Sequence, residues 1–227
     1  MENEATTAGE ATTAVTAVAG AAVLIGRHHD ISAFASTDVS RYVLNGVHYN
    51  ARLGVVEATD GYALVRVPVC RRAEEFPPVK AGEATLEDCI IPVAAFKKAL
   101  ANTCKTSTLP VLQCARLSGA DGKVTMAASD LDTEQAVTVK GIEGTYPNCD
   151  QVIPAEEPAL TITVAASLLK RVAEYAERHG RELGTSGVPI TFEFIGALSA
   201  IRFSVPLDDA MGETPVARGV LMPMRLA

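Results

Sequence analysis

The chain has 227 residues, of which 48% are hydrophobic and 21% charged, as expected for a globular protein of one or two domains. Its formal net charge of −7 argues against a plainly basic nucleic-acid binder, although a locally basic surface remains compatible with it. Trp is absent and aromatic residues make up 5%, so stacking platforms for single-stranded nucleic acid are scarce.

The first 13 residues are rich in Ala, Thr and Glu, and we expect a disordered tail there. The tail carries no basic residue, which is unlike a secretory leader, and the apolar run 15–25 is too short to span a membrane. We therefore expect a cytoplasmic protein with no membrane partner. A first half-domain over 14–80 follows, with a weak helix within 18–29 and strands at 41–50, 55–60 and 62–69.

A second half-domain is expected over 85–150 and has the clearest pattern. A short strand at 89–92 precedes a helix, "PVAAFKKALANT", whose apolar residues repeat at helical spacing. Strands at 107–119, 123–130 and 133–141 follow, and "DGK" predicts a hairpin turn between the first two.

A third half-domain is expected over 157–227. It begins with a strand at 159–164 and continues with the longest predicted helix, at 165–180, which ends at Gly180. Strands follow at 189–196, 199–206 and 217–226, and Pro223 places the last strand at an edge or a bulge. The helix residues expected to face inward are Leu168, Leu169, Val172, Tyr175 and Ala176.

The same order of elements thus occurs three times, and one pair of copies also shares residues. "ATDGYALVRVPV" (58–69) aligns with "ASDLDTEQAVTV" (128–139) at an offset of 70 residues, which pairs Asp60 with Asp130. No His or second carboxylate is placed to make either Asp an acid catalyst, so we expect both to brace turns. The predicted fold class is α+β.

Five cysteines and four histidines offer no metal or catalytic spacing. The cysteine count is odd, no pair has CxxC spacing, and no His shares a motif with a Cys. We interpret the cysteines as reduced, mostly buried thiols. No nucleophile–base pair and no Gly-rich phosphate loop is evident, so we expect a protein that is not an enzyme and that holds no cofactor or metal.

Several motifs, taken in order, resemble the bacterial beta sliding clamp of the replicative DNA polymerase. They are "RYVLNGV" (41–47), "ATDG" (58–61), "STLPVLQCARLSGADGKVTMAASDLD" (107–132), "YPNCDQVIP" (146–154) and "MPMRL" (222–226). The resemblance implies a DNA-clamp fold of strand–helix–three-strand half-domains, with helices on one face of a curved antiparallel sheet. It also implies a non-enzymatic processivity factor for DNA replication. The implied partners are non-specific duplex DNA, DNA polymerase and other clamp-binding peptides, a clamp loader and further copies of the chain.

The chain departs from the family in size. Family members carry six half-domains and form a ring of twelve, whereas three are recognisable here. A ring of that size would need about four chains, and a smaller ring, an open arc or a monomer is equally compatible with the sequence.

The resemblance also implies a peptide-binding groove, in which flexible Met side chains adapt to varied apolar anchors. The alternative is that these are ordinary core residues at strand ends. Where the family has a basic residue and His after "TDG", this chain has Tyr62-Ala63, so its partner preference is expected to differ. The implied groove residues are Leu44, Thr59, Gly61, Tyr62, Leu64, Pro154, Val220, Met222, Pro223, Met224 and Arg225.

Basic residues on the predicted helices and near the second strand are candidates for phosphate contacts. Glu174 and Glu177 interleave with those of the last helix, so a solvated face of paired charges is the alternative. The candidates are Arg41, Tyr42, Lys97, Lys98, Lys105, Lys170, Arg171, Arg178 and Arg181.

Two functional hypotheses remain open. The first is a shortened sliding clamp that self-associates around duplex DNA and binds polymerase and repair peptides. The second is an interaction protein that keeps the fold but does not hold DNA, and instead binds clamp-binding peptides or modulates a clamp.

Overall fold

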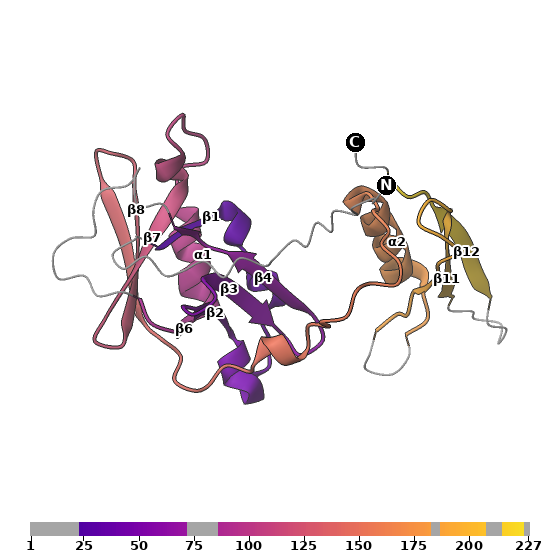
Figure 1. The fold of residues 1–227 in the computed structure, drawn as a ribbon, viewed down its shortest axis with the longest axis horizontal. Helices are drawn as coiled ribbons and strands as arrows, with labels where there is room; N and C mark the ends of the chain where they lie inside the picture. Colours follow the sequence, from indigo (N-terminus) through magenta and orange to yellow (C-terminus); the bar gives the residue numbers. More distant parts are fainter. Residues whose placement is uncertain (1–22, 72–85, 183–186, 208–214, 225–227) are drawn as a thin grey trace, which may run out of the picture. The chain divides into compact units, whose positions relative to one another are not determined.

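Antiparallel sheets carry the fold, because the alternating apolar residues of the sequence each bury one face of a strand. The computed structural model describes residues 23–71, 86–182, 187–207 and 215–224 (Figure 1). They fall into two compact units, Met1–Ile153 (unit 1) and Pro154–Ala227 (unit 2), and each is treated by itself. The expected tail at 1–13 lies outside the described residues.

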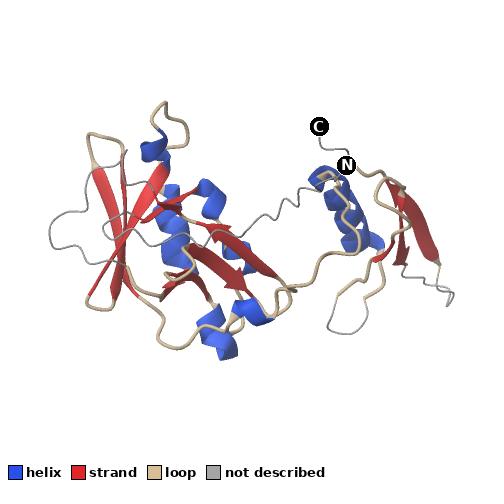
Figure 2. Cartoon of the chain, in the orientation of Figure 1, coloured by secondary structure: helices blue, strands red, loops and turns tan. Residues whose placement is uncertain are grey.

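Unit 1 contains two sheets and one α-helix among its described residues (Figure 2). The helix, α1 (Val93–Ala101), buries Phe96, Ala99 and Leu100, so the predicted face is confirmed. No helix in the described part of the chain is long and apolar enough to cross a membrane. The strands are β1 (Val23–Gly26), β2 (Gly46–Asn50), β3 (Val55–Thr59), β4 (Leu64–Pro68), β5 (Cys70–Arg71), β6 (Cys89–Pro92), β7 (Cys114–Ala120), β8 (Lys123–Ser129) and β9 (Glu134–Lys140).

The helix expected within 18–29 is wrong where the structure describes it. Residues 23–26 form β1, all four of them buried, and a 3₁₀ turn follows at Arg27–His29. A strand buried on both faces does not alternate, and a short apolar run such as "VLIG" fits helix and strand equally well. Residues 41–44, expected as strand, belong to a 3₁₀ helix (Val39–Leu44) that Asp38 caps by accepting a hydrogen bond from Ser40 N.

The two half-domains of unit 1 exchange their first strands. The sheet orders are β5-β1-β7-β8-β9 and β4-β3-β2-β6, so β1 lies beside the strands of the second half and β6 beside those of the first. Both exchanged strands pair antiparallel with their new neighbours. Val23 of β1 lies opposite Leu117 of β7, and Cys89 of β6 lies opposite Tyr49 of β2. One hydrophobic core therefore serves both halves, and α1 packs into it through Phe96, which is fully buried.

The 70-residue repeat has a structural counterpart in two matching hairpin turns. Asp60 Oδ1 accepts hydrogen bonds from the backbone N–H groups of residues 62 and 63, and Asp130 Oδ1 accepts them from residues 132 and 133. These bonds hold the pKa of both carboxyls below its ordinary value. The expectation that the two aspartates brace turns is confirmed. The "DGK" hairpin is confirmed too, with Asp121 and Gly122 both at positive φ.

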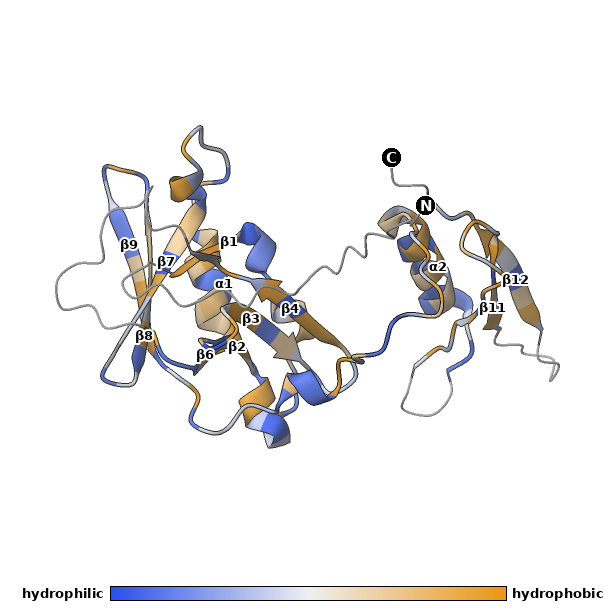
Figure 3. Ribbon diagram, viewed as in Figure 1, coloured by the Kyte–Doolittle hydropathy of each residue, from blue (hydrophilic) through white to orange (hydrophobic). Residues whose placement is uncertain are grey.

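Unit 2 consists of one helix and one sheet in its described residues. Its elements are α2 (Ala166–His179), β10 (Thr191–Glu193), β11 (Ile201–Pro206) and β12 (Val216–Leu221), and its sheet order is β10-β11-β12. Val172 and Ala176 of α2 are buried and Leu168 half-buried, as predicted. Leu169 and Tyr175, expected to face inward, are 42% and 39% exposed. Figure 3 shows hydrophobic and hydrophilic residues side by side around α2.

Three strand predictions in unit 2 are wrong in extent. The strand expected at 189–196 covers only 191–193, and the one expected at 217–226 ends at Leu221, before Pro223. Residues 159–164, expected as strand, adopt no regular structure. A strand needs a paired neighbour, and the segment has no strand beside it among the described residues.

Candidate functional site

The implied groove residues of unit 1 lie at or beneath the β3–β4 hairpin. Leu44 is buried, and Leu64 packs against the same small apolar cluster, which also contains Ile90, Tyr146 and Cys149. Gly61, at φ 93°, and Tyr62 form the exposed turn above it. Leu44 is thus a core residue, as the alternative interpretation expected, while the hairpin tip is exposed.

The implied groove residues of unit 2 are mostly exposed. Val220 and Met222 are 60% and 62% exposed, and Met224 is also exposed. Val220 lies opposite Arg202 of β11, and Met224 N donates a 2.7 Å hydrogen bond to Thr163 O. Pro154 is exposed, Pro223 is half-buried, and Arg225 lies outside the described residues. A groove that uses both sets of residues stays a prediction.

A buried carboxylate, absent from the sequence-based candidates, organises the sheet beside the hairpin. Glu57 of β3 is 1% exposed and stands between His48 of β2 and Arg66 of β4. Its Oε1 lies 2.8 Å from His48 Nδ1, and its Oε2 accepts a 2.8 Å hydrogen bond from Arg66 Nε. Burial acts to raise the pKa of Glu57, but the hydrogen bonds from His48 and Arg66 outweigh it, so this pKa lies below its ordinary value.

The same cluster fastens residues 146–150 to the sheet. The Asp150 carboxylate forms ion pairs with Arg66, at 2.9 Å, and with Arg52, at 2.8 Å. The hydrogen bond from Arg66 lowers the pKa of Asp150. The Tyr146 ring stacks on His48 with centroids 4.5 Å apart, and its hydroxyl accepts a hydrogen bond from Thr59 N. Burial raises the pKa of Tyr146 and raises that of Cys149 to about 11.

This cluster fixes the base of the candidate hairpin and the residues that lead to Pro154. Thr59 is held from below by Tyr146, and its Oγ1 accepts a hydrogen bond from Gly61 N. The signal that could have found the cluster is the spacing of His48, Glu57 and Arg66, nine residues apart in strands that pair by hairpins. His48 lies within the sheet, and its ring contacts Glu57 in the neighbouring strand.

The candidate DNA-binding residues differ in their freedom to bind phosphate. Lys97 and Lys98 of α1 and Lys105 after it are exposed. On α2, Lys170 Nζ lies 3.6 Å from Glu174 Oε1, whereas Arg171 and Arg178 are exposed, as is Arg181 beyond the helix.

Near the hairpin, Arg41 Nη1 donates to Asp60 O at 3.2 Å, and its Nε lies 3.8 Å from Asp38. Arg41 therefore braces the turn, and Tyr42 beside it is 56% exposed.

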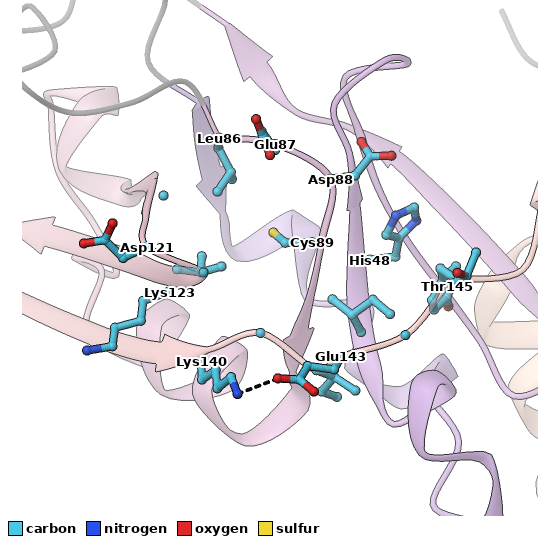
Figure 4. Close-up of a pocket in the computed structure, with 18 residues that line it drawn as sticks. His48, Leu86, Glu87, Asp88, Cys89, Asp121, Lys123, Lys140, Glu143 and Thr145 are labelled. Atoms are coloured by element: carbon cyan, nitrogen blue, oxygen red, sulfur yellow. Dashed lines mark ion pairs between the residues drawn. The ribbon is translucent and has the colours of Figure 1, made fainter.

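A cleft of about 660 Å³ lies between β6, the turn that joins β7 to β8, and residues 140–146 (Figure 4). His48 and Tyr146 line it, together with acidic and basic residues, including the Lys140–Glu143 ion pair at 2.5 Å. None of the implied groove or DNA-binding residues lines this cleft. In the described ranges no three His, Cys, Asp or Glu side chains converge as a metal site. The four cysteines with described side chains are free.

Solved structures with the same fold are bacterial sliding clamps. The DNA polymerase sliding clamp from Bacillus subtilis is 15% identical, with a TM-score of 0.62 over 89% of this chain and 49% of that one. The beta sliding clamp of C. crescentus is 20% identical, with a TM-score of 0.56 over 92% and 52%. DNA polymerase III subunit beta from Borrelia burgdorferi is 14% identical, with a TM-score of 0.58 over 88% and 48%.

The chain therefore has the sliding-clamp fold, in which α-helices and antiparallel sheets combine as the resemblance implied. It spans about half the length of those clamps. No family model matches the sequence, and no curated protein matches it significantly. At these identities the likeness shows the fold alone, and activity and partners are matters for proposal.

Replacing the buried carboxylate with its amide tests the cluster. Glu57→Gln keeps the shape but leaves Arg66 without its buried counter-charge, so the free energy of unfolding of unit 1 should fall by about 3 kcal/mol. Urea unfolding followed by circular dichroism measures this. The matched control is Glu143→Gln, which removes a carboxylate from an exposed ion pair and should leave stability unchanged. Equal effects of the two substitutions would contradict the role of Glu57.

The difference in stability between wild type and Glu57→Gln should depend on pH, and its sign follows from the lowered pKa of Glu57. A carboxyl with a lowered folded-state pKa stabilises the protein above its ordinary value of 4.5, and that stability is lost as the pH falls through the folded value. The difference in unfolding free energy between wild type and Glu57→Gln should therefore shrink as the pH falls below 4.5. Urea unfolding at a series of pH values measures it, and a difference that stays constant on acidification would exclude an ionised Glu57.

Proposed function

We propose that this chain is a shortened sliding-clamp-like scaffold for DNA replication, which self-associates around duplex DNA and binds peptides of polymerase and repair proteins. The observation that carries the proposal is the sliding-clamp fold over 89–92% of the chain, as matched to the clamps of Bacillus subtilis and C. crescentus. A clamp loader is a further proposed partner, and the site of action is the cytoplasm. The protein acts by binding, without catalysis of its own.

Exposed lysines on α1 support the DNA-binding part of the proposal. Phe96, Ala99 and Leu100 point into the core, so Lys97 and Lys98 project from the opposite side of the helix. Lys98 also lies in the last turn, where a cation is favoured by the helix dipole. Non-specific phosphate contacts of this kind need positive charge and exposure, but no base-specific geometry.

A second candidate function is a clamp-like interaction protein that binds peptides without holding DNA. The ion pair between Lys170 and Glu174 favours it, since that lysine is already matched by a carboxylate. Glu177 is also exposed on the same helix. The two candidates differ in one measurable property, which is salt-sensitive binding to duplex DNA.

Neutralising the α1 lysines tests DNA binding. Lys97→Gln/Lys98→Gln should weaken binding to duplex DNA and reduce the slope of log K against log salt by about 0.9 for each phosphate that the lysines no longer neutralise. Fluorescence anisotropy with a labelled duplex at several salt concentrations measures this. The control Lys123→Gln/Lys140→Gln removes the same charge from other exposed positions of unit 1 and should keep the wild-type slope. If wild type binds no duplex at low salt, the non-encircling candidate replaces the clamp.

A pair of matched polar substitutions tests peptide binding. Met222→Ser removes an apolar side chain that is 62% exposed, and Leu198→Ser removes one that is 64% exposed in the same unit. Met222→Ser should weaken binding of a synthetic clamp-binding peptide about tenfold, which is about 1.4 kcal/mol. Leu198→Ser should leave the affinity unchanged. Isothermal titration calorimetry measures both, and equal affinities would place the groove elsewhere.

A further inference from the structure

Each half-domain of unit 1 needs a neighbour to complete its sheets. The strand that precedes the helix of the second half, β6, pairs on one side with β2 of the other half. On its other side, Ile142 N, which follows the last strand of the same half, donates a 2.8 Å hydrogen bond to Ile90 O. In the first half, β1 likewise lies between β5 of its own half and β7 of the other.

Unit 2 repeats this arrangement up to the point where a second half is required. Thr163 stands three residues before the first residue of α2, as Ile90 does before α1, and Met224 N donates to Thr163 O as Ile142 N does to Ile90 O. Residues 162–165 therefore correspond to β6, and they make the same contact as β6 with the end of their own half. No strand lies on their other side in the residues that the structure describes for unit 2.

The second open edge of unit 2 is that of β10. In unit 1, β7 is the first strand of the three that follow α1, and it pairs with β1 of the other half. β2 has the same place in the first half, and it pairs with β6 of the second half. In unit 2 the corresponding strand, β10, ends the sheet order β10-β11-β12. β10 has three residues, whereas the paired β7 has seven. Unpaired edges of this kind expose backbone donors and acceptors that another strand can satisfy.

Apolar side chains along these edges are less covered than their counterparts in unit 1. Ile25 of β1 and Ile91 of β6 are 0% exposed, since each is enclosed by the other half. The corresponding Val164, and Ile162 two residues earlier, are only half-buried, although both pack against the unit 2 core. Covering them would release further apolar surface from water.

We infer that unit 2 pairs with unit 2 of a second copy of this chain across a two-fold axis, so that residues 162–165 of each copy add an antiparallel strand to β10 of the other. A second copy fits because each chain offers both the strand that is supplied and the edge that receives it. A two-fold axis satisfies both edges at once, as in any isologous contact. The resulting body would repeat the reciprocal exchange that joins the two halves of unit 1.

Unit 1 also predicts the register of the new pairing. One row of residues crosses the sheet of unit 1 from Val23 on β1 through Leu117 and Met126 to Val137 on β9. Val137 lies five residues before Ile142, the residue that bonds to Ile90. In unit 2 the counterpart of Ile142 is Met224, and Gly219 lies five residues before it. The row that begins at Gly219 on β12 continues through Phe203 on β11 to Phe192 on β10. Ile162 of the second copy should thus oppose Phe192, and Thr163 of the second copy should oppose Thr191.

Disulfide trapping tests this register in the full chain and without DNA. Thr163→Cys/Thr191→Cys should give, on mild oxidation, a covalent dimer of twice the chain's 23.8 kDa on a non-reducing gel. The control Thr163→Cys/Ser204→Cys moves the second cysteine one strand away, since Ser204 of β11 lies opposite Thr191, and should not cross-link. Wild type, with its five native cysteines, and both single variants should also stay uncross-linked.

Light scattering on the unmodified chain provides a measurement that needs no substitution, and it should give twice the monomer mass at micromolar concentration. A strict monomer overturns the inference, as does a dimer that cross-links equally through the control pair or fails to cross-link through the predicted one. The inference supplies the contact for the self-association in the proposed function and rests on that proposal to this extent. Failure of DNA or peptide binding alone would leave the dimer in place, so the two can fail separately.

Discussion

In unit 1 the first strand of each half lies in the sheet of the other half, and both the core and the candidate hairpin are built on this exchange. A half-domain of this fold leaves two sheet edges open, and unit 1 closes both by giving each half the first strand of the other. This exchange joins the two halves around one core and places Val23, Ile25 and Ile91 out of water. The described residues of unit 2 have the same local elements but no strand of a second half beside them, and the apolar side chains at these edges are only half-buried.

The charge cluster around Glu57 adds a second level of organisation on the surface of that scaffold. Buried charges are tolerated only where partners compensate their desolvation, and here His48 and Arg66 do so across three adjacent strands. Asp150 extends the cluster to residues 146–150, so the segment that leads to Pro154 is held against the sheet. The candidate groove residues at the hairpin therefore lie on strands that this cluster holds together.

DNA and peptide binding are drawn from the sliding-clamp fold and from exposed lysines and methionines. Self-association is drawn from open edges in unit 2 and from the completed exchange in unit 1. The proposed pairing would give unit 2 the same reciprocal exchange that joins the two halves of unit 1.

Local periodicity predicts α1, β8, β9, the "DGK" turn and the bracing role of Asp60 and Asp130, because these depend on neighbours in the chain. Of the strand expected at 107–119, only the part from Cys114 onward is correct, since residues 110–113 form a 3₁₀ helix. Periodicity does not predict β1, because all four residues of "VLIG" are buried and their sheet partners on β7 lie about 90 positions away. The Glu57 cluster was likewise decided by tertiary structure, because its partners meet only when β2, β3 and β4 pair. The segment 159–164 shows the same limit, since a strand-like pattern becomes a strand only when another edge pairs with it.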